Sequence, residues 1–223
     1  MNNEAIDEKP VGDAYRMNID FLTLRKVLGI LGFLLPFALI LGNGRKVEES
    51  ISHYYYTDMS VVFTGVLITF GLFLISYKGY LKEKGEFLSD NTITNWAGIF
   101  AIIVALVPTA CSYCESGAPN GHNDSIASTV HLVCAGLFIT LMGYMSFNQF
   151  VKGEHQDPTA KKRKRLYRIS GLVIWAVIAA LLVEVIIDDQ FTKYDVFIGE
   201  TIALVFFGIA WLVKGEALEK IGL

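Results

Sequence analysis

The sequence predicts an all-α fold, a polytopic membrane helix bundle with six transmembrane helices and both termini in the cytoplasm. Hydrophobic residues make up 53% of the chain and charged residues 18%, whereas a soluble domain carries roughly 25% charge. The apolar residues also fall into separate blocks, and the basic residues fall on one side of them. The formal net charge of −3 excludes a broadly basic nucleic-acid binder and an acidic disordered chain.

Each apolar block is long enough for one transmembrane helix, because about 20 residues rising 1.5 Å each cross the hydrocarbon layer. Helices are required because backbone groups inside lipid find no water to bind. The alternative is a soluble protein with deeply buried helices, but a soluble helix of this length normally shows a polar stripe. The predicted spans are residues 21–42, 58–77, 92–110, 126–150, 168–187 and 196–213.

The spans form one transmembrane domain over residues 21–216. Residues 1–20 are polar and acidic, and they lack the basic start and short apolar core of a cleaved signal. We expect them to be a flexible cytoplasmic tail, and residues 217–223 to be a second, short one. The connections leave no room for a separate soluble domain.

The basic residues set the orientation. Of the 19 Lys and Arg residues, only Arg45, Lys46 and Lys193 fall on the predicted outer side. The positive-inside rule therefore predicts cytoplasmic termini and a location in the plasma (inner) membrane. A basic run before the fifth span either anchors this topology or also binds anionic lipid headgroups. The run is Lys161, Lys162, Arg163, Lys164 and Arg165.

Ionisable side chains gather near the outer ends of several spans. Such residues are costly in a membrane and are often functional. Counted along the helices, three of them lie about 5–8 Å inside the outer ends of their spans. We expect either a shared polar pocket that opens outward, or interfacial residues that reach water and pair with each other. The pocket candidates are His131, Glu184, Glu200, Asp58 and His53.

Two cysteines lie three residues apart in the second outer loop, Cys111 and Cys114. In an oxidising compartment they would form a small disulfide loop, and otherwise they are free thiols. A zinc site would add His122 and His131, but this spacing fits no standard zinc motif, so no cofactor is predicted. Cys134 lies within the fourth span and is expected to be a small buried apolar residue.

Serine–histidine neighbours also occur in the sequence. Ser128 and His131 share a helix face, and Ser50 and Ser52 closely precede His53. Nothing in the sequence marks an oxyanion hole, and no H-E-x-x-H, G-x-S-x-G or phosphate-loop motif is present. Coincidence is therefore the favoured explanation of these neighbours.

Several segments resemble a known family. The stretch Val130-His-Leu-Val-Cys-Ala-Gly-Leu-Phe-Ile-Thr-Leu-Met-Gly-Tyr144 looks like the fourth-span pattern of the Frag/DRAM/Sfk six-span membrane family and related uncharacterised bacterial membrane proteins. Glu49-Ser-Ile-Ser-His-Tyr-Tyr-Tyr-Thr-Asp58 resembles its Ile-Ser-rich segment, and Asn95-Trp-Ala-Gly98 its third span. The resemblance covers roughly residues 25–216. It implies a role in membrane lipid organisation, lipid-anchor remodelling or stress response, with no defined chemistry.

The main functional hypothesis is an integral membrane protein that binds a lipid or small amphiphile in the outward-facing pocket. One alternative is a membrane-embedded hydrolase or acyltransferase with a metal or His/acid centre. Another is an oligomeric channel or transporter whose acidic outer vestibule attracts cations. The expected partners are membrane lipids, with anionic headgroups at the cytoplasmic face, and not nucleic acid. A homo-oligomer is compatible with the sequence.

Overall fold

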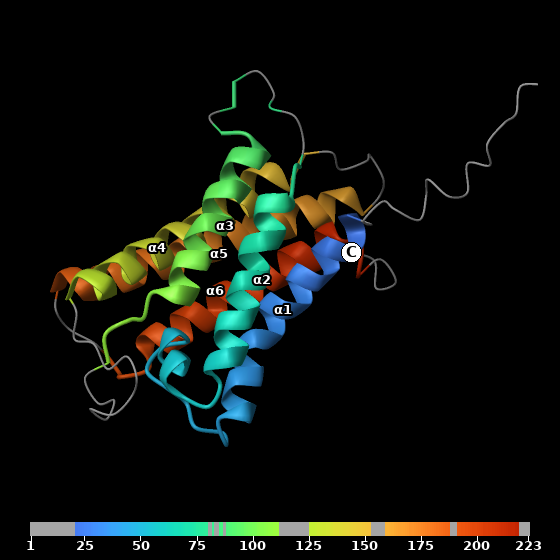
Figure 1. Ribbon diagram of the computed structural model, residues 1–223. Coiled ribbons are helices and arrows are strands. Elements are labelled where there is room, and N and C mark those ends of the chain that lie inside the picture. Colours follow the sequence, from blue (N-terminus) through green and yellow to red (C-terminus); the bar gives the residue numbers. More distant parts are fainter. Residues whose placement is uncertain are drawn as a thin grey trace, which may run out of the picture.

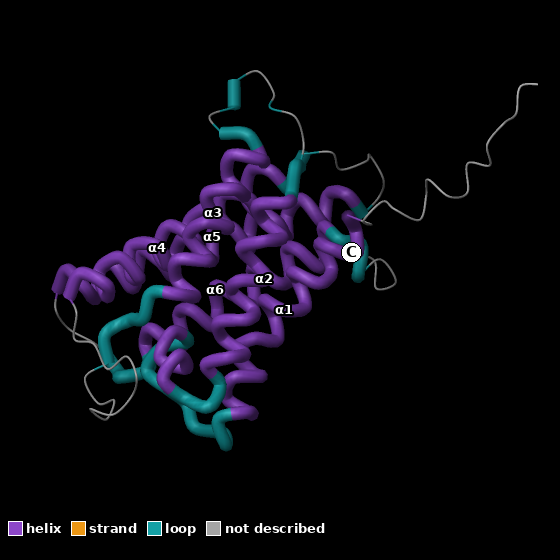
Figure 2. The backbone as a smooth tube through the Cα atoms, in the orientation of Figure 1, coloured by secondary structure: helices purple, strands orange, loops and turns teal. Residues whose placement is uncertain are grey.

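The computed structural model describes residues 21–79, 82, 85–86, 88–111, 125–152, 159–187 and 191–218. Within these residues the protein is helical and contains no strand (Figure 2), which confirms the all-α prediction. The helices are α1 (Phe21–Gly42), the short 3₁₀ helix η2 (Ser52–Tyr56), α2 (Ser60–Ser76), α3 (Asp90–Leu106), α4 (Ser125–Tyr144), the π-helical turn η3 (Met145–Gln149), α5 (Ala160–Ile187) and α6 (Asp195–Lys214).

Four of the described helices are long and apolar enough to cross a membrane: α1, α4 with its extension η3, α5 and α6. The other two, α2 and α3, are apolar but have 17 residues each. At 1.5 Å per residue they are about 25 Å long, somewhat less than the hydrocarbon core. A membrane protein of several spans is therefore supported, and the count of six stays a prediction.

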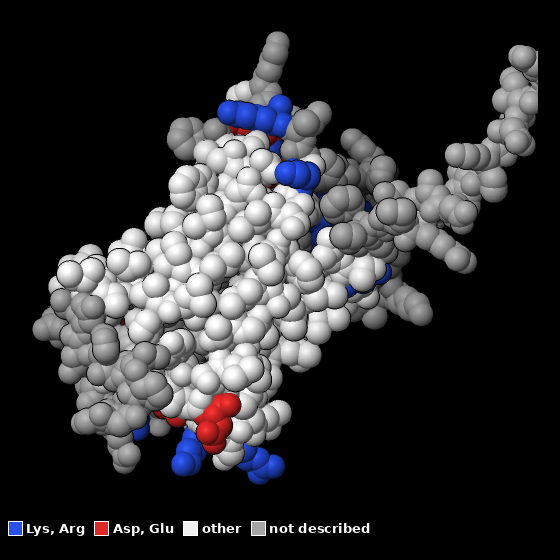
Figure 3. Space-filling view, in the orientation of Figure 1, with Lys and Arg blue, Asp and Glu red and all other residues white. Residues whose placement is uncertain are grey.

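The surface agrees with a membrane location. In Figure 3 the charged side chains lie toward the ends of the molecule, and the broad band between them is uncharged. Many large apolar side chains of the helices are exposed, among them Val61, Leu132 and Ile186. Contiguous exposed apolar surface of this kind marks contact with lipid or with another protein.

Counting η3 with α4, two helix boundaries differ from the predicted spans by more than two residues. α3 ends at Leu106 because Val107 precedes Pro108, and a residue before proline avoids the helical conformation; Val107 is extended, with φ −97° and ψ 115°. α5 begins at Ala160, so the basic run predicted in a loop lies in its first two turns. The early end of α3 matters for the site, because the carbonyl groups that follow it are no longer needed for helix hydrogen bonds.

The six long helices form a closed ring. Each packs on its neighbour in the sequence, and α6 packs on α1 to close it (Figure 1). Glycines make the closure tight: a Cβ atom on Gly208 would lie 2.6 Å from the backbone nitrogen of Phe33 and 2.7 Å from the carbonyl oxygen of Gly29. Small residues of this kind let the backbones of membrane helices approach closely.

Aromatic side chains fill the inside of this ring. The rings of Phe70 and Phe207 have centroids 5.4 Å apart, and those of Phe150 and Trp211 are 4.9 Å apart at a steep angle. All four side chains are at most 2% exposed. Aromatic contacts of this type add to the stabilisation from packing.

A buried lysine, Lys214, holds the C-terminal end of α6. Residues 49–56 contact the other end of this helix. The Lys214 ammonium group donates to the carbonyl oxygens of Phe150 at 2.9 Å and of Lys152 at 3.0 Å.

Replacing Lys214 by methionine should lower the free energy of unfolding by about 1–3 kcal/mol, because both carbonyls lose a charged donor. Thermal unfolding in detergent would measure this, with the exposed Lys46→Met as control. Equal melting of the two variants would contradict the prediction.

Candidate functional site

The connection between α1 and α2 folds back against α6. We call residues 49–56 the plug segment. The Ile51 N–H donates to Oε2 of Glu200 at 2.6 Å, and the Phe197 N–H donates to the Glu49 carbonyl oxygen at 3.0 Å. The first N–H groups of a helix have no partner within it, so the plug segment satisfies one such group at the start of α6.

His131, on α4, joins the plug segment to the end of α3. Its Nδ1 lies 2.6 Å from the Val107 carbonyl oxygen, and its Nε2 lies 2.8 Å from Ser52 Oγ. A carbonyl only accepts hydrogen bonds, so Nδ1 carries a proton; in the neutral ring Nε2 then accepts from the Ser52 hydroxyl. His131 is 3% exposed and Ser52 6% exposed. The early end of α3 before Pro108 presents the carbonyl that orients the ring.

A second serine–histidine pair lies nearer the surface. Ser50 Oγ is 2.8 Å from Nδ1 of the half-buried His53, whose Nε2 lies 3.0 Å from the Ala110 carbonyl oxygen. The Ala110 N–H in turn donates to Ser128 Oγ at 3.2 Å. The two histidines thus tie the plug segment to residues 107–110 at two points.

Two tyrosines of the plug segment complete its attachment. The Tyr54 hydroxyl donates to the Lys46 carbonyl oxygen at 2.9 Å, and the Tyr56 hydroxyl donates to the Thr109 carbonyl oxygen. Burial raises the pKa of Tyr54 and of Tyr56 above the ordinary tyrosine value. Both hydroxyls therefore remain protonated hydrogen-bond donors throughout the physiological pH range.

A groove of about 590 Å³ lies between α4, α5 and α6. Its walls are mostly apolar, and two carboxyl groups line it, Glu184 from α5 and Glu200 from α6. Gly136 lies on its α4 wall, and a Cβ atom there would meet nothing within 4 Å. The remaining lining residues are Leu132, Ala135, Ile139, Ile178, Leu181, Leu182, Val185 and Val196.

A small hollow of about 40 Å³ lies deeper in the bundle, lined by Ser52 and Glu200 among apolar side chains. The groove and the hollow share Ala135, Ile139 and Glu200 as lining residues. The hollow therefore adjoins the groove, and Ser52 is one of its lining residues.

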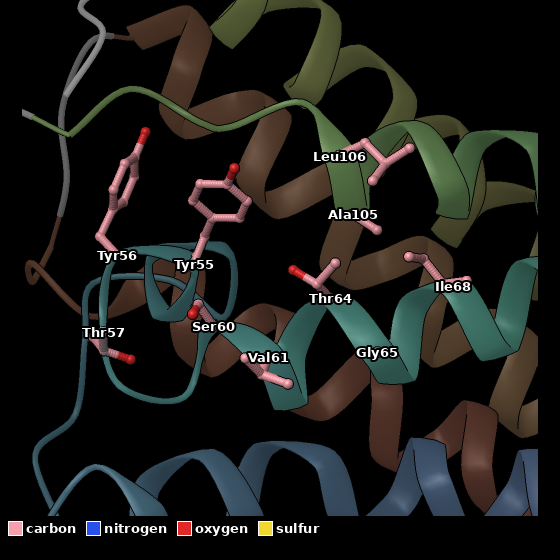
Figure 4. A pocket seen from close by; sticks show the side chains of 10 residues that line it. All are labelled: Tyr55, Tyr56, Thr57, Ser60, Val61, Thr64, Gly65, Ile68, Ala105 and Leu106. Atoms are coloured by element: carbon pink, nitrogen blue, oxygen red, sulfur yellow. The ribbon is translucent and has the colours of Figure 1, made fainter. Parts of the chain in front are cut away.

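A third hollow, of about 610 Å³, lies between η2, the start of α2 and the end of α3. Figure 4 shows Tyr55 and Tyr56 at one end of it, with Thr64 and Gly65 of α2 on another side. Its lining holds hydroxyl groups but no carboxylate or imidazole. This hollow therefore lacks the carboxyl groups that the groove offers to a polar ligand.

The structure distributes the five predicted pocket residues over four places. Glu184 and Glu200 line one groove. His131 contacts the wall of the adjoining hollow through Ser52, and His53 belongs to the second serine–histidine pair. Asp58 is exposed just before α2 and lines none of the three cavities.

The cysteines and the zinc alternative are described only in part. Cys111 is in a disulfide, while Cys134 is a buried free thiol; Cys114 and His122 lie outside the described residues. Both ring nitrogens of His131 are engaged in hydrogen bonds. Over the described ranges no three His, Cys, Asp or Glu residues are grouped as metal ligands.

The pairing of Ser52 with His131 was not anticipated from the sequence, which paired His131 with Ser128 on the same helix. The two partners are 79 residues apart. The one available signal was Pro108, which ends α3 early and frees a carbonyl beside α4.

Comparison with known proteins adds no assignment, because no family model, curated protein or solved structure matches the chain. The function must therefore be argued from the geometry of the groove and the plug segment.

Proposed function

We propose that the protein is a six-span integral membrane protein that binds a lipid or small amphiphile in the groove between α4, α5 and α6. The observation that carries this proposal is the groove itself, which combines apolar walls with two carboxyl groups. Its volume of about 590 Å³ falls in the range of about 300–1,000 Å³ that is usual for small-molecule sites.

The groove favours a ligand with an apolar chain and a polar head. Leu132, Leu182 and Val185 line it and are exposed, so an apolar chain can enter sideways from lipid. Glu184 and Glu200 supply hydrogen-bond acceptors that suit a hydroxyl or amine group in the head. Burying a carboxyl beside apolar walls is costly unless it is paired, which is consistent with a polar head at this position.

Contacts between the helix ends support six crossings. At one end of the bundle, an Arg25 guanidinium nitrogen donates to the Tyr77 hydroxyl at 3.0 Å, and another to the Lys214 carbonyl oxygen at 3.4 Å. At the other end, the plug segment contacts the end of α3 and the starts of α4 and α6. Since α2 and α3 link these two ends, both cross the bilayer, with local thinning accommodating their length.

The orientation completes the proposal. The end that holds Arg25 and Lys214 also holds the basic first turns of α5, so the positive-inside rule places it in the cytoplasm of a plasma (inner) membrane protein. Residues 161–165 would there contact anionic headgroups. A role in membrane lipid organisation or stress response, as the Frag/DRAM/Sfk resemblance implies, is compatible with a lipid-binding groove.

Filling the groove tests the proposal. Replacing Gly136 by phenylalanine places a ring in the open space of the groove and should weaken binding of a fluorescently labelled lysophospholipid in micelles at least tenfold. Gly65 is an equally open helical glycine outside the groove, so Gly65→Phe should bind like the unmodified protein. Equal affinity of all three proteins, or loss in both variants, would contradict the groove as the site.

A further inference from the structure

We propose that Ser52 and His131 form a nucleophile–base pair that cleaves or transfers the acyl ester of a lipid held in the groove. This inference rests on the proposed lipid binding and adds a reaction to it. It extends the hydrolase or acyltransferase alternative with named residues and without a metal. The serine comes from the plug segment, the base from α4, and the substrate from the groove.

The hydrogen bonds around His131 have the pattern of a serine–histidine centre. A nucleophilic serine needs a base within about 2.6–3.2 Å and a third group that orients the base. Ser52 Oγ lies 2.8 Å from Nε2 of His131. The Val107 carbonyl, 2.6 Å from Nδ1, acts as the orienting group in place of a carboxylate. This contact selects the tautomer whose Nε2 lone pair faces the serine.

The cavities give a lipid access to this serine. Ser52 lines the small hollow, and three residues of that hollow also line the groove. The hollow measures about 40 Å³, and one water needs about 10–15 Å³, so it has room for a carbonyl group or a water. A lipid with its acyl chain in the groove and its ester toward Glu200 would therefore present the ester carbonyl to Ser52.

The second pair, Ser50 and His53, serves as an internal comparison. Its hydrogen bond has the same length, 2.8 Å. Ser50 lines neither the groove nor the small hollow, so we expect a lipid bound in the groove not to reach it. A comparison of the two pairs therefore shows whether a serine–histidine hydrogen bond is enough to make the serine reactive, or whether the serine must also line a cavity.

The reaction needs only the lipid ester and water or a second alcohol. Ser52 Oγ attacks the ester carbonyl carbon, its proton moves to His131 Nε2, and the carbonyl electron pair moves onto oxygen. When the carbonyl re-forms, the bond to the leaving alcohol breaks, and that alcohol takes the proton from Nε2. Water, or another alcohol, then loses a proton to Nε2 and releases the acyl group from Ser52, which recovers its proton.

A long-chain alkyl fluorophosphonate in micelles tests the pair, since it reacts covalently with activated serines. Intact-protein and peptide mass spectrometry should find one adduct, on Ser52, in the unmodified protein and in Ser50→Ala. Ser52→Ala should show none, and His131→Ala should react at least 100-fold more slowly, as loss of a general base implies. Thermal unfolding of each variant checks folding, and Ser52→Ala gives the answer even where His131→Ala unfolds.

The lysophospholipid measurement distinguishes the two proposals. An unmodified protein that binds the labelled lysophospholipid but forms no adduct would overturn the nucleophile–base pair and leave lipid binding intact. Loss of both would overturn both. An adduct on Ser50, or an equal adduct in Ser52→Ala, would also overturn the assignment of Ser52.

Discussion

Replacing Glu200 by leucine is expected to lower the free energy of unfolding by about 1–3 kcal/mol, the cost of leaving a buried donor without its acceptor. The donor is the Ile51 N–H, which lies 2.6 Å from Oε2 of Glu200. Ile51 is 4% exposed, so water cannot readily replace the lost carboxyl. The plug segment should therefore detach from α6, and the apparent melting temperature in detergent should fall.

Two further variants sharpen this expectation. Glu200→Gln keeps a side-chain oxygen at the same place and should recover most of the lost stability. Glu184→Leu removes the other carboxyl that lines the same groove, which comes from α5, and should melt near the unmodified protein. If both leucine variants melt alike, the hydrogen bond to Ile51 is not what makes Glu200 important for stability.

Adding a single methyl group at Gly208 is expected to destabilise the bundle by about 3 kcal/mol, near the upper end of the usual cost of overpacking. The new Cβ would lie 2.6 Å from the Phe33 backbone nitrogen. Backbone atoms cannot turn aside as a flexible side chain can, so α1 and α6 would have to separate. Their contact closes the ring, and the aromatic residues inside it would repack.

Gly65→Ala is the matched control for this change. It makes the same chemical substitution in α2, where a Cβ atom meets nothing within 4 Å. Alanine is the better helix former by up to about 1 kcal/mol, so Gly65→Ala should melt at or above the temperature of the unmodified protein. A Gly208→Ala variant that melts as high as Gly65→Ala would show that α1 and α6 are not packed as closely as described.

The apolar blocks predicted the helices well because lipid exposure acts on each helix separately. The first predicted span, residues 21–42, coincides with α1. The third predicted span, residues 92–110, ends too late. Apolar residues continue past Leu106, but Pro108 stops the helix there. The positions of Glu184 near the end of α5 and of Glu200 near the start of α6 were also predictable, because position along a helix follows from residue count alone.

The contacts of the plug segment could not be predicted in the same way. Ser52 and His131 meet only because α3 ends early and the α1–α2 connection folds inward. The first follows from Pro108, but the second depends on tertiary packing, and neither leaves a periodic pattern in the sequence. A loop residue has no fixed direction, so its distance from a helix cannot be counted.

The anchoring of the plug segment on α6 also has a consequence for biosynthesis. Ile51 and Glu200 are 149 residues apart, and at a synthesis rate of about 5–20 residues per second that interval takes roughly 7–30 s. During this interval, α1 and the plug segment lack α6, the helix that they contact in the folded protein. α1 and the plug segment must therefore be protected, by the insertion machinery or by transient contacts, until α6 has been synthesised and packs against them.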